Sequence, residues 1–144
     1  MFNSILVVCT GNICRSPIGE RYLRSLLPNK KIDSAGTSAL VDHAADESAI
    51  LVASSHGISL DGHVAKQFTS SLGRQYDLIL VMEKYHIEQI GRIAPEARGK
   101  TMLFGHWLNQ RDIPDPYRKS NEAFLSVYKL IEQAGGLWAP KLGA

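Results

Sequence analysis

The sequence predicts an α/β fold in which helices cover a parallel β-sheet. Continuous aliphatic runs of strand length occur at 3–9 and 77–82, and such runs are typical of strands that are covered on both faces. Segments with apolar residues at helical spacing alternate with the strands over short connections. This alternation favours parallel pairing through right-handed crossovers.

The predicted elements follow one another in a regular order. The strand at 3–9 precedes a helix that begins at Pro17, with Ser16 as its cap, and stops at Pro28. There follow a short strand at 31–34, a helix at 46–56, the strand at 77–82, a helix at 83–93 and a weaker strand at 100–104. A last helix spans 120–133, and we expect Gly135 and Gly136 to interrupt it.

Length and composition indicate one globular domain, 1–144. The 144 residues are 44% hydrophobic and 21% charged, and a domain of ~150 residues buries roughly 70% of its unfolded surface. The formal net charge of +2 is too balanced to indicate nucleic acid or an anionic membrane as the main partner. Neither a secretory signal nor a membrane span is visible, so we expect a cytoplasmic protein.

The two cysteines, Cys9 and Cys14, lie close together near the amino end. A bridge between them would close a loop too small to staple a fold, so we expect both to be thiols available for chemistry. The five histidines show no ligand-like spacing, and no metal or other cofactor is expected. Four of these histidines have no assigned role and are expected to be exposed: His43, His56, His86 and His106.

Residues 9–16 join the first strand to the first helix and have the features of an anion site. Gly11 and Asn12 tolerate positive φ, so the backbone can curl until its amides converge near the helix amino end. The same positive field favours the nucleophilic thiolate form of Cys9, and Arg15 can bind two oxygens of a phosphoryl group. The alternative is that Cys9 is a small buried apolar residue and Arg15 a solvated one.

An acid is needed opposite such a nucleophile, because a phenolate leaves slowly unless it is protonated. Asp115 is the candidate, since prolines on both sides restrict its backbone. Asp112 is the rival acid and ranks lower because nothing fixes its geometry. The alternative is that Asp115 has no catalytic role and is a solvated residue in a rigid surface turn.

These segments resemble a known family. Residues 8–17, from Val8 to Pro17, resemble the phosphate loop of the low-molecular-weight protein tyrosine phosphatases, and Asp115-Pro116-Tyr117 resembles their general-acid loop. The likeness spans nearly the whole chain and is greatest to the bacterial branch that acts on tyrosine autokinases of exopolysaccharide export. It implies a metal-free phosphomonoesterase with a three-layer, flavodoxin-like fold around a four-stranded parallel sheet.

The resemblance also implies roles for individual residues. Cys9 would be the nucleophile, Arg15 the phosphoryl clamp, and Asp115 the acid and then the base. Ser34 and His63 fall where the family has a serine and a histidine that support the loop through its asparagine. The residues expected to bind substrate are Thr10, Gly11, Asn12, Ile13, Cys14, Ser16, Leu40 and Tyr117.

Four residues bear on selectivity and redox behaviour. Ile13 and Tyr117 can supply apolar walls for an aromatic ring. Leu40 stands where the family often has an aromatic wall residue, so we expect a looser or differently selective entrance. Cys14 is expected to pack against the helix, or alternatively to pair with oxidised Cys9.

Two other functions share this loop. An arsenate reductase relays oxidation to further cysteines, but this chain has none after Cys14. A phosphotyrosine-binding module without chemistry would not need Cys9, Arg15 and Asp115 together. We therefore expect a phosphatase that acts on phosphotyrosine in a protein, with a tyrosine autokinase as the implied partner and phosphate or another oxyanion in the loop.

Overall fold

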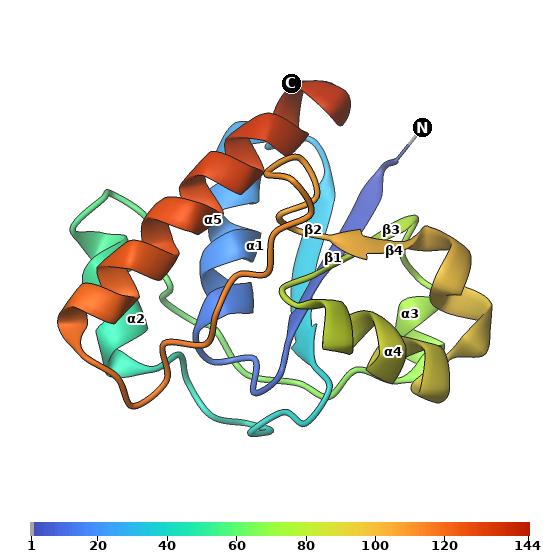
Figure 1. The fold of residues 1–144 in the computed structure, drawn as a ribbon, viewed down its shortest axis with the longest axis horizontal. Helices are drawn as coiled ribbons and strands as arrows, with labels where there is room; N and C mark the ends of the chain where they lie inside the picture. Colours follow the sequence, from blue (N-terminus) through green and yellow to red (C-terminus); the bar gives the residue numbers. More distant parts are fainter. Residues whose placement is uncertain (1) are drawn as a thin grey trace.

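A computed structural model describes residues 2–144. Its strands are β1 (Ser4–Cys9), β2 (Lys31–Gly36), β3 (Leu78–Val81) and β4 (Thr101–Leu103). They form one four-stranded sheet in the order β2-β1-β3-β4, and every neighbouring pair is parallel. The sheet confirms the predicted fold class (Figure 1).

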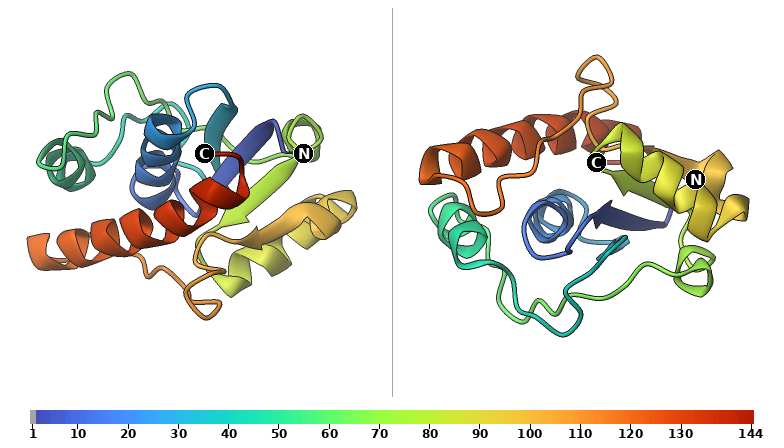
Figure 2. Two further views of the ribbon diagram at one scale, coloured as in Figure 1. Left: turned by 90° about the horizontal axis from the view of Figure 1, so that it is seen from above. Right: turned by 60° about the horizontal axis from the view of Figure 1, so that its bottom comes forward.

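Helices cover both faces of the sheet. α1 (Arg15–Leu26), α2 (Glu47–Ser54) and α5 (Asn121–Lys141) lie on one side, whereas α3 (Ser70–Gly73), α4 (Lys84–Ile93) and the 3₁₀ helix η1 (Pro95–Lys100) lie on the other (Figures 1 and 2). Ile5 and Val7 of β1 face the first core, and Leu6 and Val8 face the second. Burial on both faces explains the uninterrupted aliphatic run of this strand.

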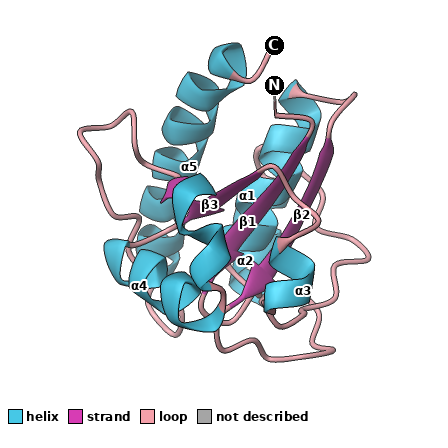
Figure 3. Cartoon of the chain, turned by 90° about the vertical axis from the view of Figure 1, so that its right-hand side faces the viewer, coloured by secondary structure: helices cyan, strands magenta, loops and turns pink. Residues whose placement is uncertain are grey.

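The strand order places a crevice at the carboxyl end of β1. β2 and β3 flank β1 on opposite sides, so the connections that leave β1 and β3 diverge there (Figure 3). Ligands of open α/β sheets bind at such a switch point. The loop between β4 and α5, orange in Figure 1, descends to the same end of the molecule.

Several element boundaries differ from the prediction, and two of the differences have a cause in the packing or in the loop. α1 begins at Arg15 and not at Pro17, because the Ser16 hydroxyl contacts Asn12 and Cys9 instead of capping the helix. The predicted break at Gly135 and Gly136 is wrong, since α5 continues to Lys141.

Packing explains why α5 continues. A Cβ on Gly135 would lie 2.8 Å from the Tyr22 ring, so the glycine allows α5 to approach α1. At its other end, α5 is preceded by Ser120, whose hydroxyl accepts from the Ala123 N–H. Within residues 2–144, no helix is long and apolar enough to cross a membrane.

Candidate active site

A pocket of about 180 Å³ opens at the carboxyl end of β1. It brings together the loop after β1, the loop after β2 and the loop before α5. Its lining residues are Cys9, Thr10, Gly11, Ile13, Cys14, Arg15, Ser38, Leu40, Asp115 and Tyr117. The prediction missed Ser38, whose backbone N–H binds the Thr10 carbonyl, because no local pattern distinguishes it from other loop serines.

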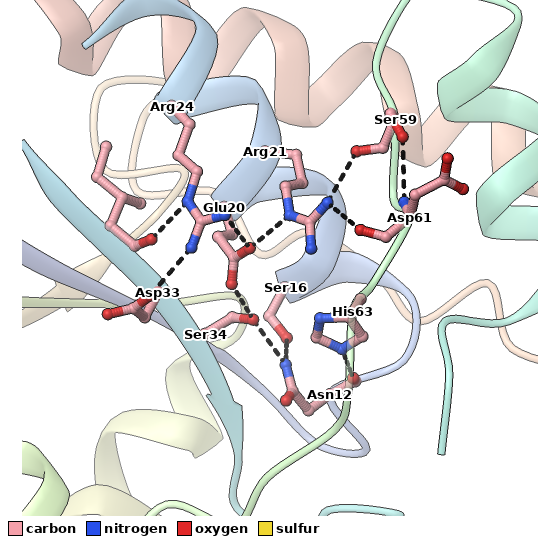
Figure 4. Close-up of polar contacts among 11 residues, drawn as sticks. Asn12, Ser16, Glu20, Arg21, Arg24, Asp33, Ser34, Ser59, Asp61 and His63 are labelled. Atoms are coloured by element: carbon pink, nitrogen blue, oxygen red, sulfur yellow. Dashed lines mark hydrogen bonds and ion pairs between the residues drawn. The ribbon is translucent and has the colours of Figure 1, made fainter. Parts of the chain in front are cut away.

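Asn12 holds the loop in its curled shape. Its backbone has φ 57°, and its side chain is fully buried. The amide nitrogen Nδ2 donates to Ser16 Oγ at 2.8 Å and to Ser34 Oγ at 3.0 Å (Figure 4). The amide oxygen Oδ1 accepts from the Lys66 N–H at 2.9 Å. These bonds compensate for a backbone conformation that most residues avoid.

His63 supports the same residue from the other side. Its Nε2 lies 2.6 Å from the Asn12 carbonyl oxygen, which can only accept, so Nε2 carries the proton (Figure 4). Burial is the main effect on the ring and lowers the pKa of His63, which favours the neutral form. Ser34 and His63 therefore both contact Asn12, as the family resemblance implied.

The hydrogen bonds of Asn12 determine where two hydroxyl protons go. Since Ser16 Oγ accepts from Asn12, its own proton is free for Cys9 Sγ, which lies 2.9 Å away. Ser34 Oγ also accepts from Asn12 and donates to Glu20 Oε1 at 2.7 Å. A hydroxyl proton is thus available to the Cys9 sulfur.

Glu20 is a buried residue of the site that the sequence analysis missed. Its carboxylate accepts from Arg21 Nε at 2.7 Å and lies 3.4 Å from Arg24 Nη1 (Figure 4). The spacing of Glu20 and Arg24, one helical turn apart, was the available signal for this pair. The two arginines compensate the buried negative charge of the Glu20 carboxylate, which accepts the hydrogen bond from the Ser34 hydroxyl.

Arg15 is buried beneath the pocket and held at one nitrogen. Nη1 donates to Glu83 Oε2 at 2.6 Å and to the Ile113 carbonyl at 2.8 Å. Both Nη1 hydrogens are therefore used, and the rest of the guanidinium is available to an anion. Nη2 lies 3.8 Å from Asp115 Oδ2, so a bound oxyanion would lie near both groups.

The two candidate acids occupy different places. Asp115 lines the pocket, and its Oδ1 accepts from the Tyr117 N–H at 3.0 Å, which fixes the carboxyl group. Asp112 Oδ1 instead accepts from the backbone N–H of Lys84 at 2.9 Å, at the first turn of α4. The geometry therefore favours Asp115 over Asp112 as the acid that faces the pocket.

The walls of the pocket are apolar. Ile13 is buried, and Leu40 and Tyr117 are partly exposed at 38% and 37%. An aromatic ring can enter between them while its phosphate reaches the loop. Within residues 2–144, no group of three or more His, Cys, Asp or Glu side chains could hold a metal ion.

The prediction that His86 is exposed is wrong. The ring is fully buried, and its Nε2 lies 2.9 Å from Thr10 Oγ1 in the loop. Its position one turn before buried Ile90 on the same face of α4 was a local signal of burial. Its contact with Thr10 could not be predicted, because it joins segments that are distant in sequence.

Cys9 and Cys14 are expected to differ in reactivity. Burial is the largest influence on Cys14, the Asp46 carboxylate acts in the same direction, and together they raise the pKa of its thiol well above the usual range. Iodoacetate at pH 7 should therefore label Cys9 at least roughly tenfold faster than Cys14. Peptide mass spectrometry over time measures both rates, and equal labelling would contradict the assignment.

Gly36 at the end of β2 supports the loop by close backbone contact. A Cβ there would lie 2.3 Å from the Thr10 carbonyl oxygen and 3.1 Å from the Asn12 nitrogen. Gly36→Ala should destabilise the protein by about 1–3 kcal/mol and weaken phosphate binding, because the loop must move. Urea unfolding and calorimetry measure the two effects. Gly99→Ala is the control, because a Cβ there meets nothing within 4 Å. Equal stability and equal phosphate affinity of the two variants would show that the close contact between Gly36 and Thr10 is unimportant.

Comparison with known proteins identifies the relatives of this chain. The family model "Low molecular weight phosphotyrosine protein phosphatase" matches residues 4–144. A putative low molecular weight protein-tyrosine-phosphatase of Klebsiella pneumoniae is 74% identical over the full length of both chains. The tyrosine phosphatase Wzb of Escherichia coli K30, solved with sulphate, is 72% identical, with a TM-score of 0.98 over 99% of this chain and 100% of that one.

A third relative was solved with an organic ligand. Wzb of Vibrio vulnificus, in complex with benzylphosphonate, is 58% identical, with a TM-score of 0.97 over 98% of this chain and 99% of that one. Similarity of this extent establishes both the fold and the enzyme class. The chain belongs to the low molecular weight phosphotyrosine protein phosphatase family and is a bacterial protein-tyrosine phosphatase of the Wzb group.

Proposed function

We propose that this enzyme hydrolyses phosphotyrosine in two steps through a phosphocysteine on Cys9. The observation that carries the proposal is one pocket in which the Cys9 sulfur, the Arg15 guanidinium and the Asp115 carboxyl group converge between apolar walls. No metal is needed, because the guanidinium and the loop amides balance the phosphoryl charge.

In the first step, the Cys9 thiolate attacks phosphorus and the bond from phosphorus to the tyrosine oxygen breaks. Asp115 gives its proton to the departing phenolate, and Arg15 binds two of the phosphoryl oxygens as charge develops on them. The products are the dephosphorylated tyrosine side chain of the substrate protein and a phosphocysteine on the enzyme.

In the second step, water attacks the phosphocysteine. The Asp115 carboxylate accepts the proton of that water, and the bond from phosphorus to sulfur breaks. The Ser16 hydroxyl, 2.9 Å from the sulfur, stabilises the departing thiolate. Inorganic phosphate leaves, and the thiolate and the protonated acid are restored for the next cycle.

We propose that the physiological substrate is a tyrosine autokinase of capsule or exopolysaccharide production, as the resemblance to the bacterial branch implies. The apolar walls formed by Ile13, Leu40 and Tyr117 fit an aryl phosphate, and the benzylphosphonate of the Vibrio relative has that shape. A free thiol requires a reducing compartment, so we place the reaction in the cytoplasm.

The test compares phosphate release from a phosphotyrosine peptide, a phosphoserine peptide and a purified phosphorylated autokinase, all in EDTA. We expect release from the phosphotyrosine peptide and the autokinase, and little from phosphoserine, whose short side chain cannot bring its phosphate to the bottom of the pocket. Arsenite formation from arsenate and thiol, or binding without phosphate release, would instead select the reductase or the silent binding module.

A further inference from the structure

The amino end of α4 contacts both ends of the phosphate loop. At the end of the loop, Glu83 Oε2 accepts from Arg15 Nη1 at 2.6 Å. At its start, His86 Nε2 lies 2.9 Å from Thr10 Oγ1. One short segment after β3 therefore holds residues at both ends of the loop.

The hydrogen bonds of His86 define its tautomer. Its Nδ1 lies 3.0 Å from the backbone N–H of Glu83, which can only donate, so Nδ1 is unprotonated. In the neutral ring, the proton is then on Nε2, which must donate to Thr10 Oγ1. Glu83 and His86 are linked a second time, because the backbone N–H of His86 donates to the Glu83 carbonyl at 2.9 Å.

Burial and the nearby Arg15 guanidinium keep His86 neutral. Burial is the main effect and the Arg15 guanidinium the next, and they lower the pKa of His86 to about 4 against the opposing influence of Asp112 and Asp115. At pH 7 the ring therefore has one proton, and the direction of its bond to Thr10 is fixed.

Thr10 has one further partner. Its Oγ1 also shares a hydrogen bond with the Tyr85 hydroxyl, 3.0 Å away. The Tyr85 ring lies beside His86, with 4.5 Å between the ring centroids, and Tyr85 is 44% exposed. The side chain of Thr10, a residue that lines the pocket, is thus held by α4.

We propose that His86 is a positioning residue for phosphate binding. It fixes Thr10 at the start of the loop and, through its backbone bonds to Glu83, supports the carboxylate that orients Arg15 at the other end. The inference rests on the proposed role of the loop as the phosphate site. It assigns His86 no contact with substrate.

Two substitutions separate the contacts of His86. The carbonyl oxygen of Asn can replace Nδ1 as the acceptor for the Glu83 N–H, but the side chain is too short to reach Thr10. The longer side chain of Gln can present an amide N–H near the position of Nε2. His86→Asn should therefore break the loop contact and keep the contact with Glu83, whereas His86→Gln should restore the loop contact.

The experiment measures the dissociation constant of inorganic phosphate by calorimetry, together with KM and Tm. Loss of one hydrogen bond to the loop should raise the phosphate dissociation constant and KM of His86→Asn about tenfold. His86→Gln should recover most of this affinity. His56→Asn, which alters a histidine stacked on Tyr128 outside the pocket, is the control and should leave phosphate affinity unchanged.

Thr10→Val tests the same contact from the loop and leaves α4 intact, so it serves if His86→Asn does not fold. Thr10→Val also removes the bond to Tyr85, so it should weaken phosphate binding at least as much as His86→Asn, and the double variant should be little worse than Thr10→Val alone. Additive effects, or a lower Tm with unchanged phosphate affinity in His86→Asn, would overturn the proposal. The experiment measures phosphate affinity and not turnover. Failure of the proposed function would instead appear as a wild-type enzyme without phosphatase activity, so the two failures can be distinguished.

Discussion

Cys9→Ser is expected to abolish turnover while phosphate binding remains. A serine hydroxyl at this position is protonated at neutral pH and is a much weaker nucleophile than a thiolate, so kcat should fall on the order of 10⁴-fold or more. The loop amides and Arg15 do not depend on the sulfur for their positions, since Asn12, Glu83 and the Ile113 carbonyl hold them.

Steady-state kinetics with p-nitrophenyl phosphate and calorimetry with inorganic phosphate test this prediction together. Circular dichroism confirms that the variant is folded. Turnover near that of the parent enzyme would exclude Cys9 as the nucleophile. Loss of phosphate binding in a folded variant would show that the sulfur itself shapes the loop.

Asp115→Asn is expected to reduce kcat in proportion to the basicity of the leaving group. Phenyl phosphate releases a phenolate whose conjugate acid has a pKa of ~10, so loss of the acid should cost about 10²- to 10³-fold with that substrate. Esters of more acidic phenols need little protonation and should be affected much less. The measurement is a plot of log kcat against leaving-group pKa for both enzymes.

Asp112→Asn is the matched control for this series. Asp112 accepts from the Lys84 N–H at the start of α4, and its substitution should lower stability slightly without steepening the leaving-group dependence. An equal loss on all esters with Asp115→Asn, or a steeper plot with Asp112→Asn, would assign the acid to another residue.

Local features of the sequence predicted the sheet and the loop. The aliphatic run of β1 requires cover on both faces, and the Gly-Asn pair after it allows the positive φ observed at Asn12. The start of α1 was misplaced because Ser16, a common capping residue, has a stronger use: its hydroxyl lies between Asn12 and the Cys9 sulfur. Propensity rules cannot foresee this competition, which depends on where the strand ends.

Contacts between distant segments could not be predicted beyond those that the family resemblance implied. Glu20 and His86 are an ordinary acidic residue and an ordinary histidine in the sequence, and each becomes part of the site only when the sheet brings its helix to the loop. The continuous α5 is a similar case, because Gly135 weakens a helix by local criteria but allows close packing against Tyr22.

Rapid-quench trapping of the enzyme with a phosphotyrosine peptide tests the central claim most directly. Acid quenching within the first turnover, digestion and mass spectrometry identify any residue that has gained a PO₃ group. We predict this gain on the peptide that contains Cys9, at its sulfur. Phosphate found on another side chain, or hydrolysis with no trapped intermediate even when its breakdown is rate-limiting, would contradict the account.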